Sequence, residues 1–120
     1  MGDYRKLEVW ECGRLLVRGM YELTASFPRT EQYGLTAQLR RAAVSVVTNI
    51  AEGSGRNSDR DFARFIAIAL GSATELGSLL LLAQDLGFAT PLACEAAASQ
   101  IERTCQMLAQ LRRRLLANSE

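Results

Sequence analysis

Apolar residues recur at spacings of three and four along residues 33–56, which is the pattern of an α-helix with one apolar face. A second face repeats small or hydrogen-bonding side chains, unlike the long charged side chains of a typical solvated surface. The apolar face comprises Leu35, Leu39, Ala42, Ala43, Val46 and Ile50, and the polar face comprises Gln38, Arg41, Ser45, Asn49 and Glu52. Gly53 and Gly55 follow, and both can adopt the left-handed conformation that closes a helix. The stretch therefore predicts a helix with a polar seam, ended by a glycine turn.

The same periodicity predicts three more helices, over residues 4–26, over residues 58–87 and from residue 90 onward. Ser58 and Thr90 are suitable N-caps, because their hydroxyls can accept backbone N–H groups of the first helical turn. The connections are short, which favours antiparallel neighbours. The 120 residues are therefore expected to form a single all-α domain, an antiparallel up-down-up-down four-helix bundle.

Two of these helices carry more apolar surface than one core contact requires. The helix over residues 4–26 has two apolar stripes, which fit either a wide core face or a helix that also meets a second subunit. The helix over residues 58–87 has little polar surface and is expected to be largely enclosed. Glu75 lies within it, and an enclosed carboxylate needs a cationic partner. A hairpin folded at the glycine turn places Arg40 and Arg41 within about one helical turn of Glu75, so we expect an ion pair with one of them.

Composition excludes several classes of chemistry. The chain has no histidine, which removes the usual general base near neutral pH and the commonest metal ligand. No pairing of a nucleophile with a base is visible, and the stretch from Gly53 to Arg56 lacks the spacing of a phosphate-binding loop. We therefore expect no enzymatic activity, no cofactor and no metal site.

Cysteine use and hydropathy bear on where the protein works. Cys12, Cys94 and Cys105 form no CxxC pair and lie among apolar neighbours, so we expect buried, reduced thiols. The first residues are charged and carry no signal-peptide core. The apolar region over residues 62–86 is interrupted by charged and small residues, which argues against a membrane span. These features predict a cytoplasmic protein that does not enter a membrane.

The polar seam has two interpretations. One is a hydrogen-bond network between helices or subunits that fixes their register. The other is a ligand-binding or catalytic cleft. Glu52 and Glu75 lie far apart along the predicted hairpin, which weakens the catalytic interpretation, and the network is therefore favoured.

Two groups of basic residues are candidates for contact with the phosphate backbone of a nucleic acid. The first group, on the N-terminal helix, comprises Arg5, Lys6, Arg14 and Arg18, and the second, near the C-terminus, comprises Arg112, Arg113 and Arg114. The alternative is a set of solvated arginines, of which those near a helix C-terminus are favoured by the helix dipole. The acids Glu8, Glu11 and Glu22 dilute the first group, and the formal net charge is only +1. No aromatic-rich platform for single strands is apparent.

Three stretches taken together resemble a known family. They are LEVWECGRLLVRGMYELTASFP, YGLTAQLRRAAVSVVTNIAEGSGR and SDRDFARFIAIALGSATELGSLLLLAQDLG. The NIAEG run, the Arg-Arg pair before it and the DF after the turn are similar to the four-helix-bundle proteins encoded in 23S rRNA intervening sequences. The accessory variability protein of diversity-generating retroelements is also similar. The resemblance covers residues 7–87, and the last helix matches only in pattern.

The resemblance implies a small protomer that assembles as a homopentameric ring and has no known catalytic activity. It also implies nucleic acid and a reverse transcriptase as partners, since the retroelement relatives bind both through a basic ring surface. The matching motifs carry over to Arg40, Arg41, Asn49, Glu52, Gly53, Gly55, Arg56 and Glu75, which we assign first to fold and assembly.

Two hypotheses for the function follow. The first is a non-enzymatic oligomeric adaptor that binds structured RNA, or an RNA–protein complex, through arginine–phosphate contacts with little sequence specificity. DNA is a further candidate ligand for the same surface. The second is a protein-interaction scaffold that binds no nucleic acid, which the near-neutral net charge favours.

Overall fold

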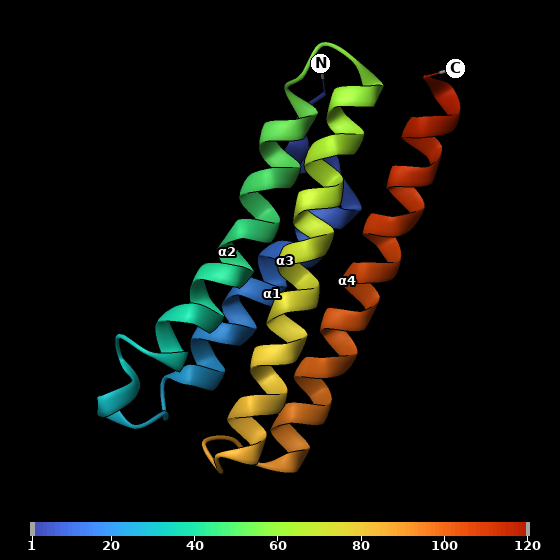
Figure 1. Cartoon of the computed structure of the whole chain (residues 1–120). Coiled ribbons are helices and arrows are strands. Elements are labelled where there is room, and N and C mark those ends of the chain that lie inside the picture. The colour runs from blue at the N-terminus through green and yellow to red at the C-terminus, as the bar shows by residue number, and fades with distance from the viewer. Residues whose placement is uncertain (1, 120) are drawn as a thin grey trace.

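The computed structural model describes residues 2–119 and confirms the all-α prediction. The described residues form four α-helices and two short 3-10 turns, and they include no strand (Figure 1). The helices are α1 (Glu8–Thr24), α2 (Leu35–Ser54), α3 (Asp59–Asp85) and α4 (Pro91–Asn118), and the 3-10 turns are η1 (Tyr4–Lys6) and η2 (Arg29–Glu31). The fold is therefore a helical bundle.

The helix connections divide the bundle into two ends. The α2–α3 turn (residues 55–58) lies at one end together with the N-terminus and the C-terminal part of α4, and we call this the turn end (Figure 1). The α1–α2 loop (residues 25–34) and the α3–α4 loop (residues 86–90) lie at the opposite end, the loop end. Helix α3 packs extensively against α2 and α4, whereas α1 and α4 have the least contact of the helix pairs that pack together. The α1–α4 seam is therefore the least closely packed side of the bundle.

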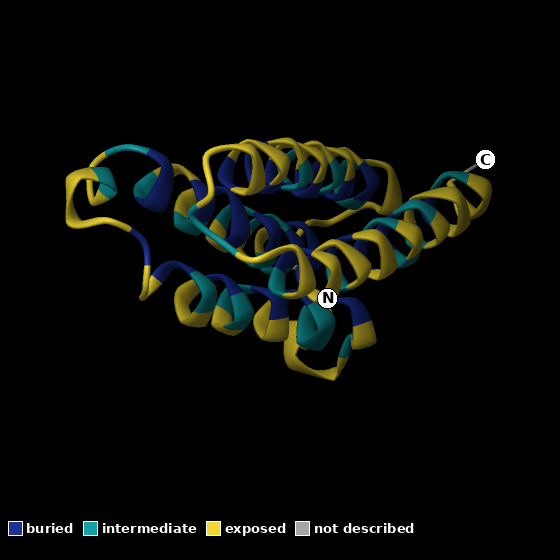
Figure 2. Ribbon diagram, turned by 90° about the horizontal axis from the view of Figure 1, so that it is seen from below, coloured by how far each residue is buried: buried dark blue, intermediate teal, exposed yellow. Residues whose placement is uncertain are grey.

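The core consists of two clusters of buried side chains. Leu39 and Leu76 belong to one cluster and Ile50 and Ile66 to the other, and none of these four residues exposes any surface. All six apolar residues named for the second helix are buried, so the periodicity predicted that face correctly. Figure 2 shows the buried residues facing the centre of the bundle and the exposed residues covering its outside.

The predicted N-caps of α3 and α4 are confirmed. The Ser58 hydroxyl accepts a hydrogen bond from the Asp61 backbone N–H at 3.1 Å. The Thr90 hydroxyl accepts one from the Ala93 N–H at 3.2 Å, and Pro91 occupies the first turn. Each hydroxyl satisfies a backbone donor that has no partner inside the helix, which fixes where the helix begins.

The glycine turn differs from the prediction. Gly53 lies inside α2, and Gly55 has φ −88° and ψ 0°, so neither adopts the left-handed conformation. That conformation occurs instead at Gly87, with φ 75°, where the backbone N–H of Phe88 reaches the carbonyl of Ala83 at 2.9 Å and closes α3. Gly53 serves a different purpose, because a Cβ atom there would lie 2.7 Å from the Cβ of Phe65 on α3. Helices α2 and α3 thus approach closely at Gly53.

The first predicted helix is two elements. Leu7 has an extended backbone, with φ −79° and ψ 127°, and separates η1 from α1. Asp3 caps η1, accepting a hydrogen bond from the Arg5 backbone N–H at 3.0 Å. The Arg5 guanidinium also contacts both oxygens of Asp3 and lowers the pKa of that carboxyl. The helical conformation therefore stops and restarts at Leu7.

Helix α3 is not enclosed as expected. Its buried stripe faces α2 and α4, but Leu81 is 64% exposed, and Leu82, Leu86 and the nearby Leu92 are also exposed. The prediction was wrong because apolar composition does not tell how many neighbours a helix has. An exposed group of large apolar side chains at the loop end remains without a partner inside the protomer.

Helix α3 is also long and apolar enough, by length and composition alone, to cross a membrane. The core helices of soluble proteins pass the same test, so this property is weak evidence. The charged and small residues that interrupt this apolar region therefore do not by themselves exclude a membrane span. The packing of α3 against α2 and α4 is the stronger argument against one.

Candidate nucleic-acid interface

Basic side chains gather at the turn end. They come from η1, from the α2–α3 turn, from the first turns of α3 and from the last turns of α4, which all lie at that end (Figure 1). The set comprises Arg5, Lys6, Arg56, Arg60, Arg64, Arg112, Arg113 and Arg114. The basic residues at this end outnumber the acidic residues that the structure describes there, which are Asp3, Glu8, Glu52, Asp59 and Asp61. The fold therefore gives this end an excess of positive charge in a chain whose formal net charge is only +1.

Arg112 lies beside two arginines of α3. Together with Arg60 and Arg64 it lines a groove of about 500 Å³ between α3 and α4. The Arg64 Nε donates to the Asp61 carboxylate at 2.9 Å, and its guanidinium lies over the Phe65 ring at 4.5 Å. Arg60 and Arg112 form no ion pair within the described residues. The groove thus offers two guanidinium groups that no carboxylate neutralises directly.

Arg114 lies on the other side of α4. With Lys6 it lines a second groove of about 320 Å³ between the start of α1 and the end of α4, where Glu8 is also found. Arg113 lies between these two positions along α4 and is exposed. The three consecutive arginines therefore straddle α4, because successive helical residues point about 100° apart.

The remaining basic residues of the first group lie elsewhere. Arg14 donates to Glu11 at 2.7 Å, and its guanidinium lies 5.7 Å from the centre of the Trp10 ring. Arg18 lies one turn further along α1, toward the loop end. The fold therefore brings Lys6 to Arg114 but leaves Arg14 and Arg18 on a separate part of α1.

Arg60 and Arg64 were not among the basic residues predicted from the sequence to contact a nucleic acid. They are four residues apart, a spacing that places both on one face of α3. That spacing was the available signal, but it gave no indication that α4 would add Arg112 to the same face. The grouping depends on the pairing of α3 with α4, which no local pattern encodes.

In the described part of the chain, the polar seam contains one hydrogen bond that joins two helices. The hydroxyls of Ser45 on α2 and Ser72 on α3 lie 2.8 Å apart. Asn49 donates from Nδ2 to the Ser45 backbone carbonyl at 2.8 Å and to its hydroxyl at 3.1 Å. Of the residues assigned to the polar seam, only Ser45 therefore forms a hydrogen bond to another helix within residues 2–119, and the bonds of Asn49 stay within α2. Gln38, Arg41 and Glu75 line a hollow of about 260 Å³ beside them.

The ion pair expected for Glu75 is absent from residues 2–119. Glu75 is exposed, and neither Arg40 nor Arg41 approaches it within 4.0 Å. Arg40 instead donates from Nε to the Thr24 hydroxyl at 2.8 Å and lies over the Tyr21 ring. The prediction was wrong because it assumed an enclosed α3, whereas a solvated carboxylate needs no partner.

The signature residues around the α2–α3 turn stabilise that turn. Arg56 donates to Glu52 at 3.0 Å, lies 3.9 Å from an Asp61 oxygen and places its guanidinium over the Phe65 ring at 4.6 Å. Gly53 permits the close approach of α3 described above. These contacts give the residues a structural role that needs no ligand.

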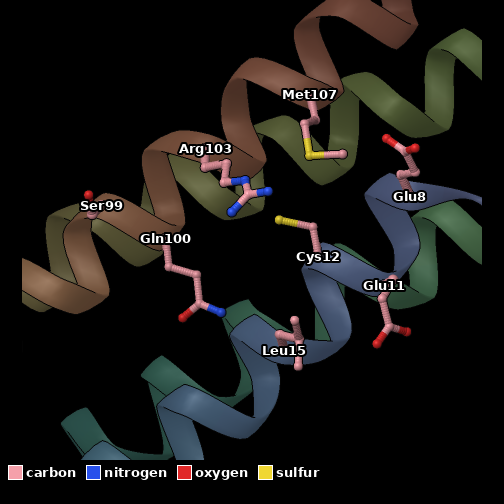
Figure 3. Close-up of a pocket in the computed structure, with 8 residues that line it drawn as sticks. All are labelled: Glu8, Glu11, Cys12, Leu15, Ser99, Gln100, Arg103 and Met107. Carbon is pink, nitrogen blue, oxygen red and sulfur yellow. The ribbon is translucent and has the colours of Figure 1, made fainter.

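Another groove, larger than the two beside α4 described above, lies along the α1–α4 seam and has mixed charge. It measures about 610 Å³ and carries Glu8 and Glu11 on α1 and Arg103 on α4. Figure 3 shows Cys12 and Arg103 pointing into the gap between the two helices. The Cys12 Sγ lies 3.1 Å from the Thr104 hydroxyl, so this thiol forms a hydrogen bond between α1 and α4. Two carboxylates in the lining make the seam a poor match for a phosphate backbone.

All three cysteines are free thiols, but they are not equally buried. Cys94 is 2% exposed, whereas Cys12 and Cys105 are partly exposed, so the expectation of burial holds fully only for Cys94. Burial raises the pKa of Cys94. Burial and the nearby Glu102 carboxylate raise the pKa of Cys105, against a smaller opposing effect of the Thr74 hydroxyl.

We expect the free energy of unfolding to fall as pH rises above the pKa of an unfolded thiol, about 8.5. In that range the unfolded chain loses thiol protons that the folded chain retains, because the folded pKa values of Cys94 and Cys105 are raised. Urea unfolding between pH 7 and about 9.5, below the range where tyrosine titrates, measures the slope. Replacing both cysteines with alanine should flatten it, and an unchanged slope would contradict the assignment.

Comparison with known proteins agrees with the fold. The chain matches the family of 23S rRNA-intervening sequence proteins over residues 5–110, which extends the resemblance into α4 but ends before Arg112. A crystal structure of a protein of unknown function from the S23 ribosomal protein family of Bacteroides thetaiotaomicron is similar, with a TM-score of 0.78. Its sequence identity is 20%, and the match covers 87% of this chain and 97% of that one. No curated protein matches the chain. The chain therefore belongs to the family of 23S rRNA-intervening sequence proteins.

Proposed function

We propose that this protein is a non-enzymatic oligomeric adaptor that binds structured RNA through arginine–phosphate contacts at the turn end. The observation that carries the proposal is a group of basic side chains at that end that form no ion pair within residues 2–119. We call this group the cationic cluster, and it comprises Lys6, Arg60, Arg112, Arg113 and Arg114. Unpaired guanidinium groups suit the bidentate recognition of phosphate oxygens.

The distribution of the cluster favours an extended backbone over a single phosphate. Arg112 and Arg114 lie on opposite sides of α4, in two grooves that flank it. Such a spread allows contacts with several phosphates and supplies affinity without reading the base sequence. A duplex or stem of RNA is the ligand that fits this arrangement, and DNA or a reverse transcriptase complex would meet the same surface.

Assembly would multiply these contacts. We propose that the protomer, an up-down-up-down bundle, forms the homopentameric ring that its family resemblance implies, and that the ring acts in the cytoplasm. The exposed leucines at the loop end, Leu81, Leu82, Leu86 and Leu92, are the surface that a neighbouring copy would cover. A ring would present several copies of the cationic cluster, and linked weak contacts bind far more tightly than one.

The test is RNA binding across a salt series. Fluorescence anisotropy of a labelled RNA hairpin should give an affinity that falls steeply with salt concentration. Replacing Arg112 with alanine should reduce the slope of log affinity against log salt by about 1 for each phosphate that the arginine neutralises. Arg103→Ala is the matched control, because Arg103 is an arginine of the same helix that lies in the α1–α4 groove with Glu8 and Glu11. The control should keep the full slope.

A scaffold for a partner protein is the second candidate, and the exposed leucines at the loop end favour it. Absence of RNA binding at low salt, from protein whose oligomeric mass has been verified by light scattering, would overturn the adaptor proposal and support the scaffold. Equal slopes for Arg112→Ala and Arg103→Ala would show that RNA binds elsewhere than at the cationic cluster.

A further inference from the structure

A further groove, at the loop end, combines aromatic rings with arginines. It measures about 460 Å³ and lies between α1 and the start of α2. Its lining includes the apolar residues Ala37 and Val44 together with Tyr21, Tyr33, Arg40 and Arg41. Tyr21 belongs to α1 and Tyr33 to the loop before α2. The fold therefore brings two rings that are twelve positions apart in the sequence to the same groove.

The two tyrosines differ in how they are held. Tyr33 is 90% exposed, so nearly its whole ring is available to a ligand. Tyr21 is 45% exposed, and the Arg40 guanidinium lies 4.4 Å from the centre of its ring. A hydrogen bond of 2.8 Å from Arg40 to Thr24 holds that guanidinium in place. The groove thus has one ring already covered by a cation and one ring uncovered.

This groove differs from the other grooves in the charge of its lining residues. Its lining contains two arginines and no carboxylate. The four other grooves and hollows described above each include at least one carboxylate among their lining residues, from Glu8, Glu11, Asp61 or Glu75. The nearby Glu31 uses its carboxylate to accept the Leu35 backbone N–H at 3.0 Å, at the start of α2. A ligand of this groove should therefore be both flat and anionic.

We infer that the groove binds an unpaired nucleotide of the RNA, with the base stacked on Tyr33 and the phosphate held by Arg41. The inference rests on the proposed function, because it adds a contact for the same ligand. A base on an aromatic ring beside cationic groups is the usual arrangement in proteins that hold single-stranded nucleic acid. Stacking accepts every base, so this contact recognises an unpaired nucleotide and no particular sequence.

The two RNA contacts lie far apart. The described chain is 47 Å long, with the cationic cluster at the turn end and the tyrosine groove at the loop end. Each contact can therefore be removed without disturbing the other. The cluster would hold a paired stem, and the groove would prefer RNA that has unpaired nucleotides.

Two RNAs with the same stem separate the contacts. One is a hairpin with 2-aminopurine in its unpaired loop, and the other is the blunt duplex of that stem. We expect tighter binding of the hairpin and quenching of 2-aminopurine fluorescence on stacking. Tyr33→Ala and Tyr33→Leu should lose on the order of tenfold in affinity for the hairpin, together with the quenching. Neither variant should change the affinity for the duplex, and Tyr33→Phe should behave as the wild-type protein does.

Each other outcome overturns the inference in a distinguishable way. Equal wild-type affinity for the two RNAs without quenching would reject the tyrosine groove and leave the adaptor proposal standing. An equal loss of affinity for both RNAs in Tyr33→Ala would do the same. No binding of either RNA would reject both proposals. A changed oligomeric mass of Tyr33→Ala by light scattering would assign Tyr33 to a subunit interface instead.

Discussion

Replacing Gly53 with alanine is expected to destabilise the bundle strongly. A Cβ atom at Gly53 would lie 2.7 Å from the Phe65 Cβ and 2.9 Å from the Phe62 ring. The Phe65 Cβ is fixed to its backbone, so α3 itself must move away. Overpacking of this kind costs about 3 kcal/mol, the improved helix propensity of alanine returns about 1 kcal/mol, and we expect a net loss of about 2 kcal/mol. That loss is a large part of the about 5–15 kcal/mol that stabilises a typical domain.

Gly55→Ala is the matched control for this substitution. Gly55 has φ −88°, which alanine adopts without strain, and its new Cβ would lie 3.6 Å from the nearest atom. The free energy of unfolding should change by no more than about 0.5 kcal/mol, because no close contact forms. Urea denaturation of both variants, followed by far-UV circular dichroism, measures the two values. Equal effects of the two substitutions would contradict the close approach at Gly53.

These two glycines show what the sequence could and could not predict. Their position between two apolar runs correctly indicated where α2 ends and the chain turns. Their roles could not be separated, because the sequence does not show that Phe65 approaches Gly53 and leaves Gly55 open. Local signals such as the caps at Ser58 and Thr90 were predicted correctly, since each depends on residues within one helical turn.

Several of the errors concern contacts between distant residues. An ion pair for Glu75 was expected because α3 was taken to be enclosed, and the structure leaves Glu75 exposed. The meeting of Arg60 with Arg112 and the meeting of Tyr21 with Tyr33 were both missed. Each of these depends on which helices become neighbours, and hydrophobic periodicity gives the buried face of a helix without naming what covers it.

The two leucines Leu76 and Leu81 test how α3 uses its apolar residues. Leu76 is fully buried between the helices, and Leu81, on the same helix, is 64% exposed. We expect Leu76→Ala to lower the free energy of unfolding by about 3–4 kcal/mol, because it removes buried methyl groups and leaves a cavity. Within a protomer, Leu81→Ala should change stability by no more than about 0.5 kcal/mol. Urea denaturation compares the two variants.

The same pair also tests assembly. If a neighbouring copy covers Leu81, the alanine variant should have a lower oligomeric mass by light scattering, and the difference should grow on dilution. Leu76→Ala should lose stability at every protein concentration, because its cavity lies inside one protomer. An oligomer of unchanged mass in Leu81→Ala would place the subunit interface away from the exposed leucines of α3. A similar loss of stability for both leucines at every concentration would show that α3 is enclosed within the protomer after all.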